Sequence, residues 1–280
     1  MRIDLHTHSV ASDGTQTPAQ VVASAAWVGL DVVALTDHDT SAGWDEAVAA
    51  GREHGVAVVR GVEMSCRAGG RSVHLLSYLP DPDDAALRAE ADTIRDARRS
   101  RARSIVELVA QDYELTWDDV LEQTVPGTTV GRPHIADALV ARGHVPDRTA
   151  AFSTILATGS PYYVPHYATP VLRAIRLVRA AGGVPVVAHP GAEGRDRPVS
   201  DKEIEAMVEA GLAGLEVHHR DNSPEQVERL TAAAARWGLL VTGSSDYHGA
   251  GKENLLGEHT TRPEVLAEIE AQGRTAVVRP

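Results

Sequence analysis

The amino-terminal stretch MRIDLHTHSVASDG, residues 1–14, carries a short apolar segment that runs directly into two histidines. Residues 2–5 indicate a β-strand, and in a strand residues two apart point to the same face. The side chains of His6 and His8 are therefore expected to lie side by side. A metal ion would explain this placement, but one such pair also arises by chance, so the ends of later strands decide the question.

Length and composition are those of an ordinary globular protein with a marked negative charge. The 280 residues, 43% of them hydrophobic, are enough for one large α/β domain or two smaller ones. The formal charge of −12 argues against a general attraction to nucleic acid or anionic lipid, so neither long duplex nucleic acid nor a membrane is an expected partner. No stretch reaches the roughly 20 apolar residues of a membrane span, and the first residues do not resemble a signal peptide. With Cys66 as the single cysteine, a cytoplasmic location is expected.

Strand-like and helical patterns alternate along most of the chain. The strand-like runs are residues 2–5, 31–39, 56–65, 72–78, 184–191, 212–219 and 239–249. Most are followed by a helical pattern, and repeated strand–helix units imply parallel strands with right-handed crossovers. This rhythm predicts an α/β fold built on a barrel or an open sheet.

Residues 81–164 break the rhythm and contain mainly helical patterns, at 83–111, 116–123, 132–143 and 147–159. The basic residues of the first pattern are interpreted most simply as a solvated face, with a ligand site as the alternative. They are Arg95, Arg98, Arg99, Arg101 and Arg103. We expect residues 1–80 and 165–280 to form the main domain and residues 81–164 to form a helical insertion.

Histidines and acids gather at the carboxyl ends of the predicted strands. In chain order they are His6, His8 and Asp13; Asp37, His38 and Asp39; Glu63; His74; His189; Glu216, His218 and His219; and Asp246 and His248. In a parallel α/β barrel these ends meet on one rim, where active sites are built. Any one of these residues is plausible as a scattered surface or core residue, but chance does not readily place them at so many strand ends.

The residue types indicate which metals would bind. Nitrogen and carboxylate ligands without thiolate suit Zn²⁺, Mn²⁺ or Fe²⁺. Their number exceeds what one ion takes, so two or three ions are expected. Two ions about 3.5–4 Å apart share a bridging hydroxide and clamp an in-line displacement. Such a cluster would also attract a phosphate despite the acidic chain.

The motifs DLHTHSVASDG, ALTDHDT, GVEMS, HLLSY, AHPG, EVHH and SSDYHG, in this order, resemble those of the PHP (polymerase and histidinol phosphatase) family. The resemblance covers residues 1–80 and about 165–280. It implies a distorted (β/α)7 barrel, the PHP fold, with a centre of three metal ions.

The resemblance also implies a set of ligands. The first ion would be held by His6, His8, Glu63 and Asp246; the second by Glu63 as a bridge with His74 and His189; the third by Asp13, His38 and His248. The histidinol-phosphatase branch usually has a histidine where this chain has Asp13. This departure bears on the occupancy and the identity of the third ion.

The segment GRPHIA, residues 131–136, is similar to a subgroup that includes 3′,5′-nucleotide bisphosphate phosphatases and 5′-to-3′ exoribonucleases. This similarity implies that the insertion covers the metal site and that Arg132 and His134 contact substrate phosphate. A solvated helix residue is the alternative for Arg132. Arg195, in the loop after His189, is a further candidate for a phosphate contact.

The expected reaction is hydrolysis of a phosphomonoester by a hydroxide that bridges two ions. Arg132 would hold phosphate oxygens, and His218 or His134 would protonate the leaving oxygen. Of the adjacent His218 and His219 only one should face the rim, and His218 is predicted. The expected substrate is a 3′,5′-bisphosphonucleotide or the 5′ end of a short RNA. The alternatives are another small phosphorylated metabolite, hydrolysis of an amide, and a PHP module without catalytic activity.

Overall fold

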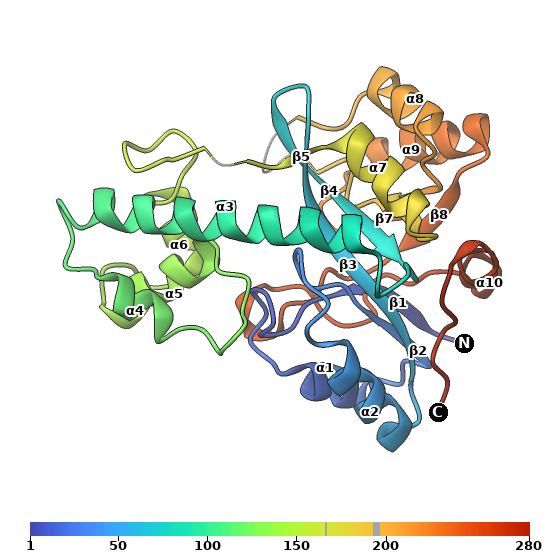
Figure 1. Cartoon of the computed structure of the whole chain (residues 1–280), viewed down its shortest axis with the longest axis horizontal. Coiled ribbons are helices and arrows are strands. Elements are labelled where there is room, and N and C mark those ends of the chain that lie inside the picture. The colour runs from blue at the N-terminus through green and yellow to red at the C-terminus, as the bar shows by residue number, and fades with distance from the viewer. Residues whose placement is uncertain (166, 193–196) are drawn as a thin grey trace.

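The fold is built on one sheet that curves into a nearly closed barrel (Figure 1). The structure is a computed structural model, and it describes residues 1–165, 167–192 and 197–280. Within these ranges the sheet has eight strands: β1 Ile3–Thr7, β2 Val32–Leu35, β3 Ala57–Ala68, β4 Arg71–Tyr78, β5 Thr169–Pro170, β6 Val184–Val187, β7 Gly214–His218 and β8 Leu240–Gly243.

The strand order shows how the barrel closes. The order is β1-β2-β3-β4-β6-β7-β8, with the two-residue β5 paired to β3 outside this path. At the open seam between β1 and β8, the amide of His8 donates to the carbonyl oxygen of Tyr247 at 2.8 Å, and Thr7 pairs with Tyr247. The predicted distorted barrel of the PHP fold is therefore confirmed.

Strand β4 departs from the all-parallel arrangement that strand–helix repeats imply. It runs antiparallel to both of its neighbours, β3 and β6. The reason is its connection to β3, because a parallel neighbour would need a long crossover and only Gly69 and Gly70 separate the two strands. Both glycines have positive φ, 55° and 83°, which suits the tight turn of a β-hairpin.

Helices cover the outside of the barrel. They are α1 Pro18–Trp27, α2 Trp44–His54, α7 Val171–Ala180, α8 Asp201–Glu209, α9 Pro224–Trp237 and α10 Pro263–Gln272, with a short 3₁₀ helix at Gly249–Gly251. Strand β2 shows how the chain sorts its apolar residues: Val33 and Leu35 pack toward the helices, whereas Val32 and Ala34 face the barrel interior. The interior cluster also includes Leu266 and Ile269, through which α10 packs against it.

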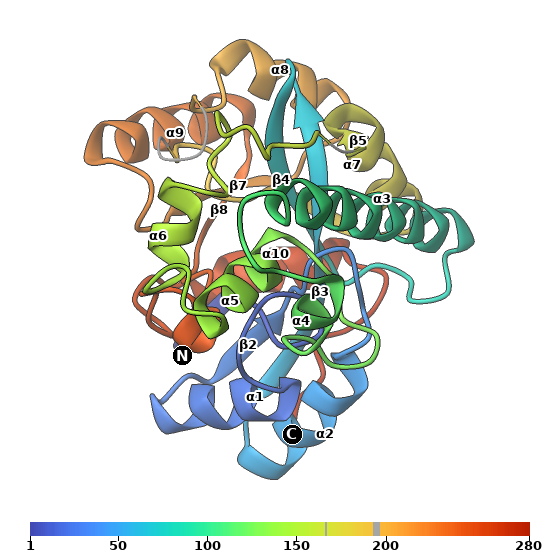
Figure 2. The same cartoon turned by 90° about the vertical axis from the view of Figure 1, so that its left-hand side faces the viewer.

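Four helices lie between β4 and β5 in the chain; the first crosses the barrel in Figure 1, and the other three lie together at its left, toward the viewer in Figure 2. They are α3 Ala85–Val109, α4 Trp117–Leu121, α5 Arg132–Ala141 and α6 Arg148–Ser153. The long α3 contributes Ile94 to the apolar layer around the barrel, while its later Ile105 packs in a separate cluster with α5 and α6. In the described ranges, none of the helices combines the length and apolarity that a bilayer crossing requires.

A buried hydrogen bond inside the barrel offers a test of the fold. The hydroxyl of the fully buried Tyr78 donates to the carbonyl oxygen of Leu5 at 2.9 Å, one residue before His6. Tyr78→Phe keeps the ring but leaves this carbonyl without that donor, so we expect the free energy of unfolding to fall by about 1–3 kcal/mol in urea denaturation. Tyr113→Phe, in the half-buried surface of the insertion, is the control. An equal effect of the two changes would contradict a special role for the Tyr78 bond.

Candidate metal centre

Strand ends bring nine histidine and acid side chains together at one end of the barrel. His6 and His8 lie at the end of β1 with Asp13 in the following turn, His38 follows β2, Glu63 lies in β3 and His74 in β4, His189 follows β6, and Asp246 and His248 follow β8. Within the described ranges eight of these side chains make three groups whose ligand atoms are close enough to share an ion, and the ninth, His189, lies 3.3 Å from Glu63.

The first group consists of His6, His8, Glu63 and Asp246. The Nε2 atoms of His6 and His8 lie 3.0 Å apart, and they lie 3.3 and 3.1 Å from Oε2 of Glu63. The same two nitrogens lie 3.5 and 3.3 Å from Oδ1 of Asp246. In a tetrahedral site with ligand distances of about 2.0–2.2 Å, neighbouring ligand atoms are about 3.3–3.6 Å apart. The group therefore fits a metal ion.

The second group consists of His38, Glu63 and His74. It involves both oxygens of the Glu63 carboxylate. Oε1 lies 2.8 Å from Nδ1 of His74 and 3.3 Å from Nε2 of His189. On the side of Oε2, Nδ1 of His38 lies at 3.2 Å. Each oxygen of this one carboxylate thus faces its own set of imidazoles, an arrangement in which Glu63 can bridge two ions.

The third group centres on Asp13. Its Oδ1 lies 3.2 Å from Nε2 of His248 and 3.8 Å from Nδ1 of His8, and its Oδ2 lies 3.8 Å from Nε2 of His38. These distances are longer on average than those of the first group, so the third group is the more open of the two.

The electrostatics of the first group favour a positive charge at its centre. Burial disfavours a charged imidazole, but the carboxylates of Glu63, Glu216 and Asp246 outweigh burial and raise the pKa of His6 well above its usual value. The pKa of His8 is likewise raised, against burial, to about 9 by Asp246 and Glu63. These carboxylates supply the negative charge that a bound cation would offset.

Further side chains orient the ligands. Oε1 of Glu216 lies 3.1 Å from Nδ1 of His6, and Oε2 of Glu216 accepts the backbone N–H of His189 at 2.8 Å. Nδ1 of His248 donates to the carbonyl oxygen of Asp246 at 2.8 Å. Such partners fix the ring orientation and leave the Nε2 atom toward the cluster.

The turn that carries Asp13 is held by Asp37. This buried carboxylate accepts the backbone N–H and the hydroxyl of Ser9, both at 2.7 Å, and the hydroxyl of Ser12 at 2.6 Å. Asp37 and the following Asp39 were noted in the sequence only as strand-end acids. In the structure both support the site from outside the three ligand groups.

Backbone strain concentrates at the same strand ends. Asp39, His189 and Asp246 have positive φ values of 54°, 31° and 54°. For residues with a side chain this conformation costs of order 1–3 kcal/mol each, and it persists where the surroundings impose it. Two of these three residues belong to the predicted ligands.

The structure corrects the choice between the adjacent histidines after β7. His218 is exposed and lies near His259 and Arg262, away from the three groups. His219 is buried, with Nε2 3.9 Å from Oδ2 of Asp246. Strict alternation along β7 would turn His218 inward with Glu216, but the strand register shifts between Glu216 and His218 and reverses the alternation.

The tautomer of His219 is set by the backbone. Its Nδ1 accepts the N–H of Asp221 at 3.1 Å, so the proton of the neutral ring is on Nε2. This buried Nε2 has no hydrogen-bond partner among the described residues. An N–H donor is therefore available on the cluster side of this ring.

The predicted phosphate contacts of the insertion have different surroundings. Arg132 begins α5, donates to the carbonyl oxygen of Leu156 at 3.3 Å and stacks over the Phe152 ring. Nδ1 of the buried His134 accepts the N–H of Gly131 at 3.1 Å, and the ring also bonds to the backbone of Ser12. His134 thus joins the insertion to the turn that carries Asp13, and its part as a proton donor stays a prediction.

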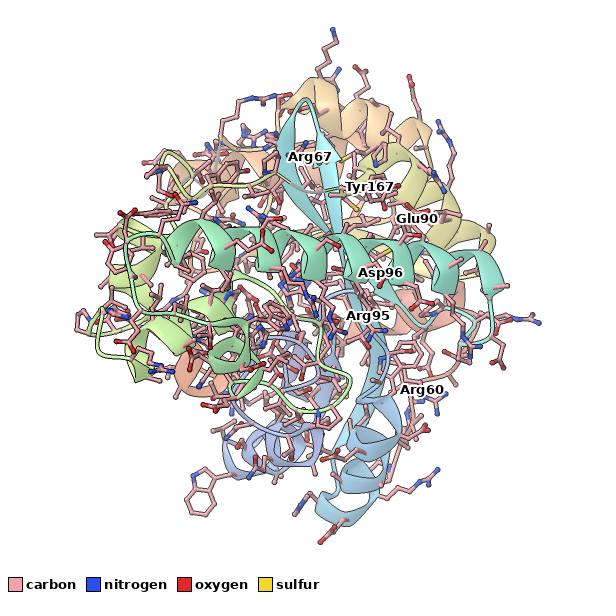
Figure 3. All side chains as sticks on the ribbon, turned by 60° about the vertical axis from the view of Figure 1, so that its left-hand side comes forward. Arg60, Arg67, Glu90, Arg95, Asp96 and Tyr167 are labelled. Carbon is pink, nitrogen blue, oxygen red and sulfur yellow. The ribbon has the colours of Figure 1, made fainter. Side chains whose placement is uncertain are left out.

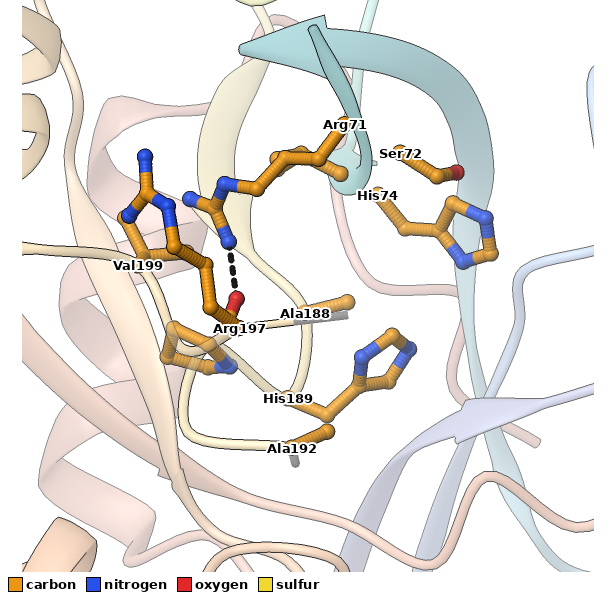
Figure 4. Close-up of a pocket in the computed structure, with 10 residues that line it drawn as sticks. Arg71, Ser72, His74, Ala188, His189, Ala192, Arg197 and Val199 are labelled. Atoms are coloured by element: carbon orange, nitrogen blue, oxygen red, sulfur yellow. Dashed lines mark hydrogen bonds between the residues drawn. The ribbon is translucent and has the colours of Figure 1, made fainter. Parts of the chain in front are cut away.

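Arg195 lies outside the described residues. The nearby Arg197 lines a pocket beside His74 and His189 (Figure 4), and its Nη2 lies 2.9 Å from Oε1 of Glu203. Arg71, in the same pocket, lies 3.2 Å from Oε2 of Glu203 and donates to the carbonyl oxygen of Arg197.

Two cations lie near the centre that the sequence analysis did not assign to it. Nζ of Lys252 lies 2.6 Å from Oδ2 of Asp246; no pattern in its loop indicates this contact. Arg98 reaches from α3 to Asp39, with Nε 3.0 Å from Oδ2, and to the Ser65 hydroxyl at 2.7 Å. The solvated-face interpretation is thus wrong for Arg98. Arg98 lies four residues from each of the buried Ile94 and Ala102, so it shares their face of the helix. This spacing could have indicated that Arg98 points inward.

Comparison with known proteins agrees with this geometry. The profile of the PHP domain matches residues 4–130. The 3′,5′-nucleoside bisphosphate phosphatase of Chromobacterium violaceum is 33% identical over 280 residues, which cover 99% of this chain and 98% of that protein. The chain belongs to the PHP family. A further relative, a 5′-3′ exoribonuclease of Haemophilus influenzae, is 31% identical over a match that covers 88% of this chain and 90% of that protein.

A solved structure agrees with the assignment to the PHP family. A protein of Bifidobacterium adolescentis described as a metal-dependent phosphoesterase is 46% identical, with a TM-score of 0.96 over 98% of this chain and 96% of that chain. With these relatives and the three ligand groups, the chain is a metal-dependent phosphoesterase, a hydrolase of the PHP family.

His8 contributes to two of the three groups, so its removal tests the centre. We expect His8→Ala to lose bound metal, measured by mass spectrometry after loading with Mn²⁺, and to lower turnover of p-nitrophenyl phosphate by orders of magnitude. His54→Ala, at the exposed end of α2, is the matched control and should keep both. A His8→Ala protein with normal metal content and activity would exclude His8 as a ligand.

Proposed function

We propose that this PHP protein hydrolyses phosphomonoesters of 3′,5′-bisphosphonucleotides or at the 5′ end of short RNA. The observation that carries the proposal is the convergence of nitrogen and carboxylate side chains at one end of the barrel, with Arg98 of the insertion beside them. The names of the two relatives, a bisphosphate phosphatase and an exoribonuclease, support these substrates.

The ligand groups would hold two or three divalent ions of manganese, zinc or iron. His6, His8, Glu63 and Asp246 would hold the first; Glu63, His74 and His189 the second; and Asp13, His38 and His248 the third. Bound ions would activate a water molecule for in-line attack and offset the charge of the phosphoryl oxygens. The donor set contains no thiolate, which agrees with these metals.

The protein's own residues would bind the phosphate and release the leaving group. Arg132, at the start of α5, would hold phosphoryl oxygens with its guanidinium fork. The Nε2–H of His219 would donate to the departing ribose oxygen, because it is buried beside Asp246 and its tautomer is fixed by the backbone. Lys252 would hold the Asp246 carboxylate in place.

Two alternatives have less support. A neutral amide would make little use of Arg98 beside the centre, since guanidinium groups match the oxygens of phosphate. A module without catalytic activity would be expected to lack ligands, whereas all nine predicted positions carry ligand-type side chains that lie together. Another small phosphorylated metabolite remains compatible with the same chemistry.

The substrate proposal has a direct test. With Mn²⁺ we expect the purified protein to release inorganic phosphate from adenosine 3′,5′-bisphosphate or from a short 5′-phosphorylated RNA, and not to hydrolyse carboxamides. Glu63→Gln, prepared in parallel, controls for contaminating phosphatases, because it alters the carboxylate that both ligand sets share. Absence of release from both the nucleotide and the RNA would contradict the proposed substrates.

The adjacent histidines provide a matched pair for the leaving-group role. We expect His219→Asn to lower kcat on the nucleotide by about 10²–10⁴-fold, the usual contribution of a general acid. The loss on p-nitrophenyl phosphate should be far smaller, since nitrophenolate leaves without a proton. His218→Asn should leave both rates unchanged, as this side chain is exposed away from the centre. If His219→Asn lowers both rates equally, the residue is not the proton donor.

A further inference from the structure

The helical insertion is bonded to the turn that carries Asp13. We call residues 9–15 the Asp13 turn. Four insertion residues bond to the backbone of four successive residues of this turn: Thr128 to Val10 at 2.8 Å, Thr129 to Ala11 at 2.9 Å, His134 to Ser12, and Arg148 to Asp13 at 3.1 Å. The insertion, residues 81–164, contains none of the nine predicted ligands. It nevertheless fixes the backbone from which one of them projects.

Arg148, the first residue of α6, also lies against the turn that follows His248. A Cβ atom added at Gly251 would overlap Nη1 of Arg148, so the guanidinium packs directly on this backbone. The amide of Gly251 donates to the carbonyl oxygen of His248 at 3.3 Å, and the amide of Thr15 donates to the same oxygen at 3.1 Å. Arg148 therefore contacts the two turns that carry Asp13 and His248.

The guanidinium of Arg148 is held by Asp137 on α5. Nε and Nη2 donate to the two carboxylate oxygens of Asp137 at 2.5 and 2.6 Å, while Nη1 donates to the carbonyl oxygen of Asp13. Such a bidentate pair fixes the plane of the guanidinium. The Asp137 carboxylate also offsets the charge of the arginine, so Arg148 holds the backbone of the turn with less repulsion of a cation at the Asp13 carboxylate.

The distances in the third ligand group follow these contacts. Oδ1 of Asp13 lies 3.2 Å from Nε2 of His248, close to the spacing of neighbouring ligands around one ion. The carboxylate oxygens of Asp13 lie farther, at 3.8 Å, from Nδ1 of His8 and Nε2 of His38. The pair of ligands whose turns Arg148 contacts is thus the pair that already lies at ligand spacing.

Another part of the insertion is attached to the barrel without Arg148. Glu90 on α3 accepts the hydroxyl of Tyr167 at 2.7 Å and that of Thr169, in β5, at 2.6 Å. Figure 3 shows Glu90 and Tyr167 next to each other near the β3–β4 hairpin. Helix α3 should therefore stay attached when Arg148 is changed, and the effect of the change should be local to the Asp13 turn.

We propose that Arg148 is a positioning residue for the third metal ion, because it holds the turns of Asp13 and His248 at the spacing that one ion requires. The inference rests on the ligand sets of the proposed function. It adds that the helical insertion, which supplies no ligand, controls the occupancy of the third site. Asp137 shares this role through its bidentate pair with Arg148.

Stepwise binding of Mn²⁺ to chelator-treated protein, measured by calorimetry, tests the inference. Asp13→Ala identifies the binding step that belongs to the third group. Arg148→Gln should weaken that step about 10–100-fold, the usual effect of losing a partner that orients a ligand, and leave the other steps unchanged. Arg148→Lys should restore part of the affinity, because an ammonium replaces one contact of the guanidinium but not its fork.

Two matched pairs control for loss of folding. Arg142→Gln removes an arginine that also pairs with an aspartate inside the insertion, with Nε 2.9 Å from Oδ1 of Asp119, and it should leave every step unchanged. Gly251→Ala pushes the Arg148 guanidinium aside without removing it, so it should weaken the same step as Arg148→Gln. At Gly159 an added Cβ atom meets open space, so Gly159→Ala should have no effect.

Hydrogen exchange of the metal-free protein gives a second measurement that needs no ion. The amides of residues 9–15 should exchange faster in Arg148→Gln than in the wild type, and at the wild-type rate in Arg142→Gln. Unchanged exchange there, equal weakening of all Mn²⁺ steps, or an Arg148→Gln protein that binds Mn²⁺ as the wild type does would overturn the inference. A wild type without a step that depends on Asp13 would instead refute the third ligand set of the proposed function, and the inference with it.

Discussion

The buried carboxylate of Glu63 is the contact on which the rest of the site depends. One oxygen faces imidazoles of His6, His8 and His38, and the other faces those of His74 and His189. Burial alone would raise the pKa of Glu63, but His74, His38 and His6 hold it well below its usual value. The carboxylate thus remains ionised in the interior. Residues far apart in sequence meet around Glu63 because the sheet nearly closes. At the seam between β1 and β8, Thr7 and His8 pair with Tyr247, next to the predicted ligand Asp246.

The departure from a regular barrel has a functional consequence. Because β4 returns antiparallel beside β3, His74 lies opposite Ser65 and the hairpin extends beyond the centre. Helix α3 crosses this extension and reaches Ser65 and Asp39 through Arg98. The site therefore has two chemically distinct parts, the histidines and acids at the end of the barrel and the Arg98 guanidinium that α3 brings beside them.

Sequence reasoning reached the features that local patterns encode. The spacing of His6 and His8 after an apolar strand, and the recurrence of histidines and acids at later strand ends, indicated the barrel and the meeting of these side chains at one of its ends. Features set by local irregularity or by contacts through space were harder to predict. The register shift in β7 exchanged His218 for His219, and the Gly69–Gly70 turn reversed β4. Arg98 and Lys252 touch the site through contacts that neither strand alternation nor a motif specifies.

The central claim is that the strand-end side chains hold cations, and anomalous X-ray diffraction from crystals grown with Mn²⁺ tests it most directly. The account predicts anomalous peaks among the nine ligands, one of them surrounded by His6, His8, Glu63 and Asp246. Data at comparable resolution without such a peak, with the same imidazoles and carboxylates bonded only to one another, would contradict it.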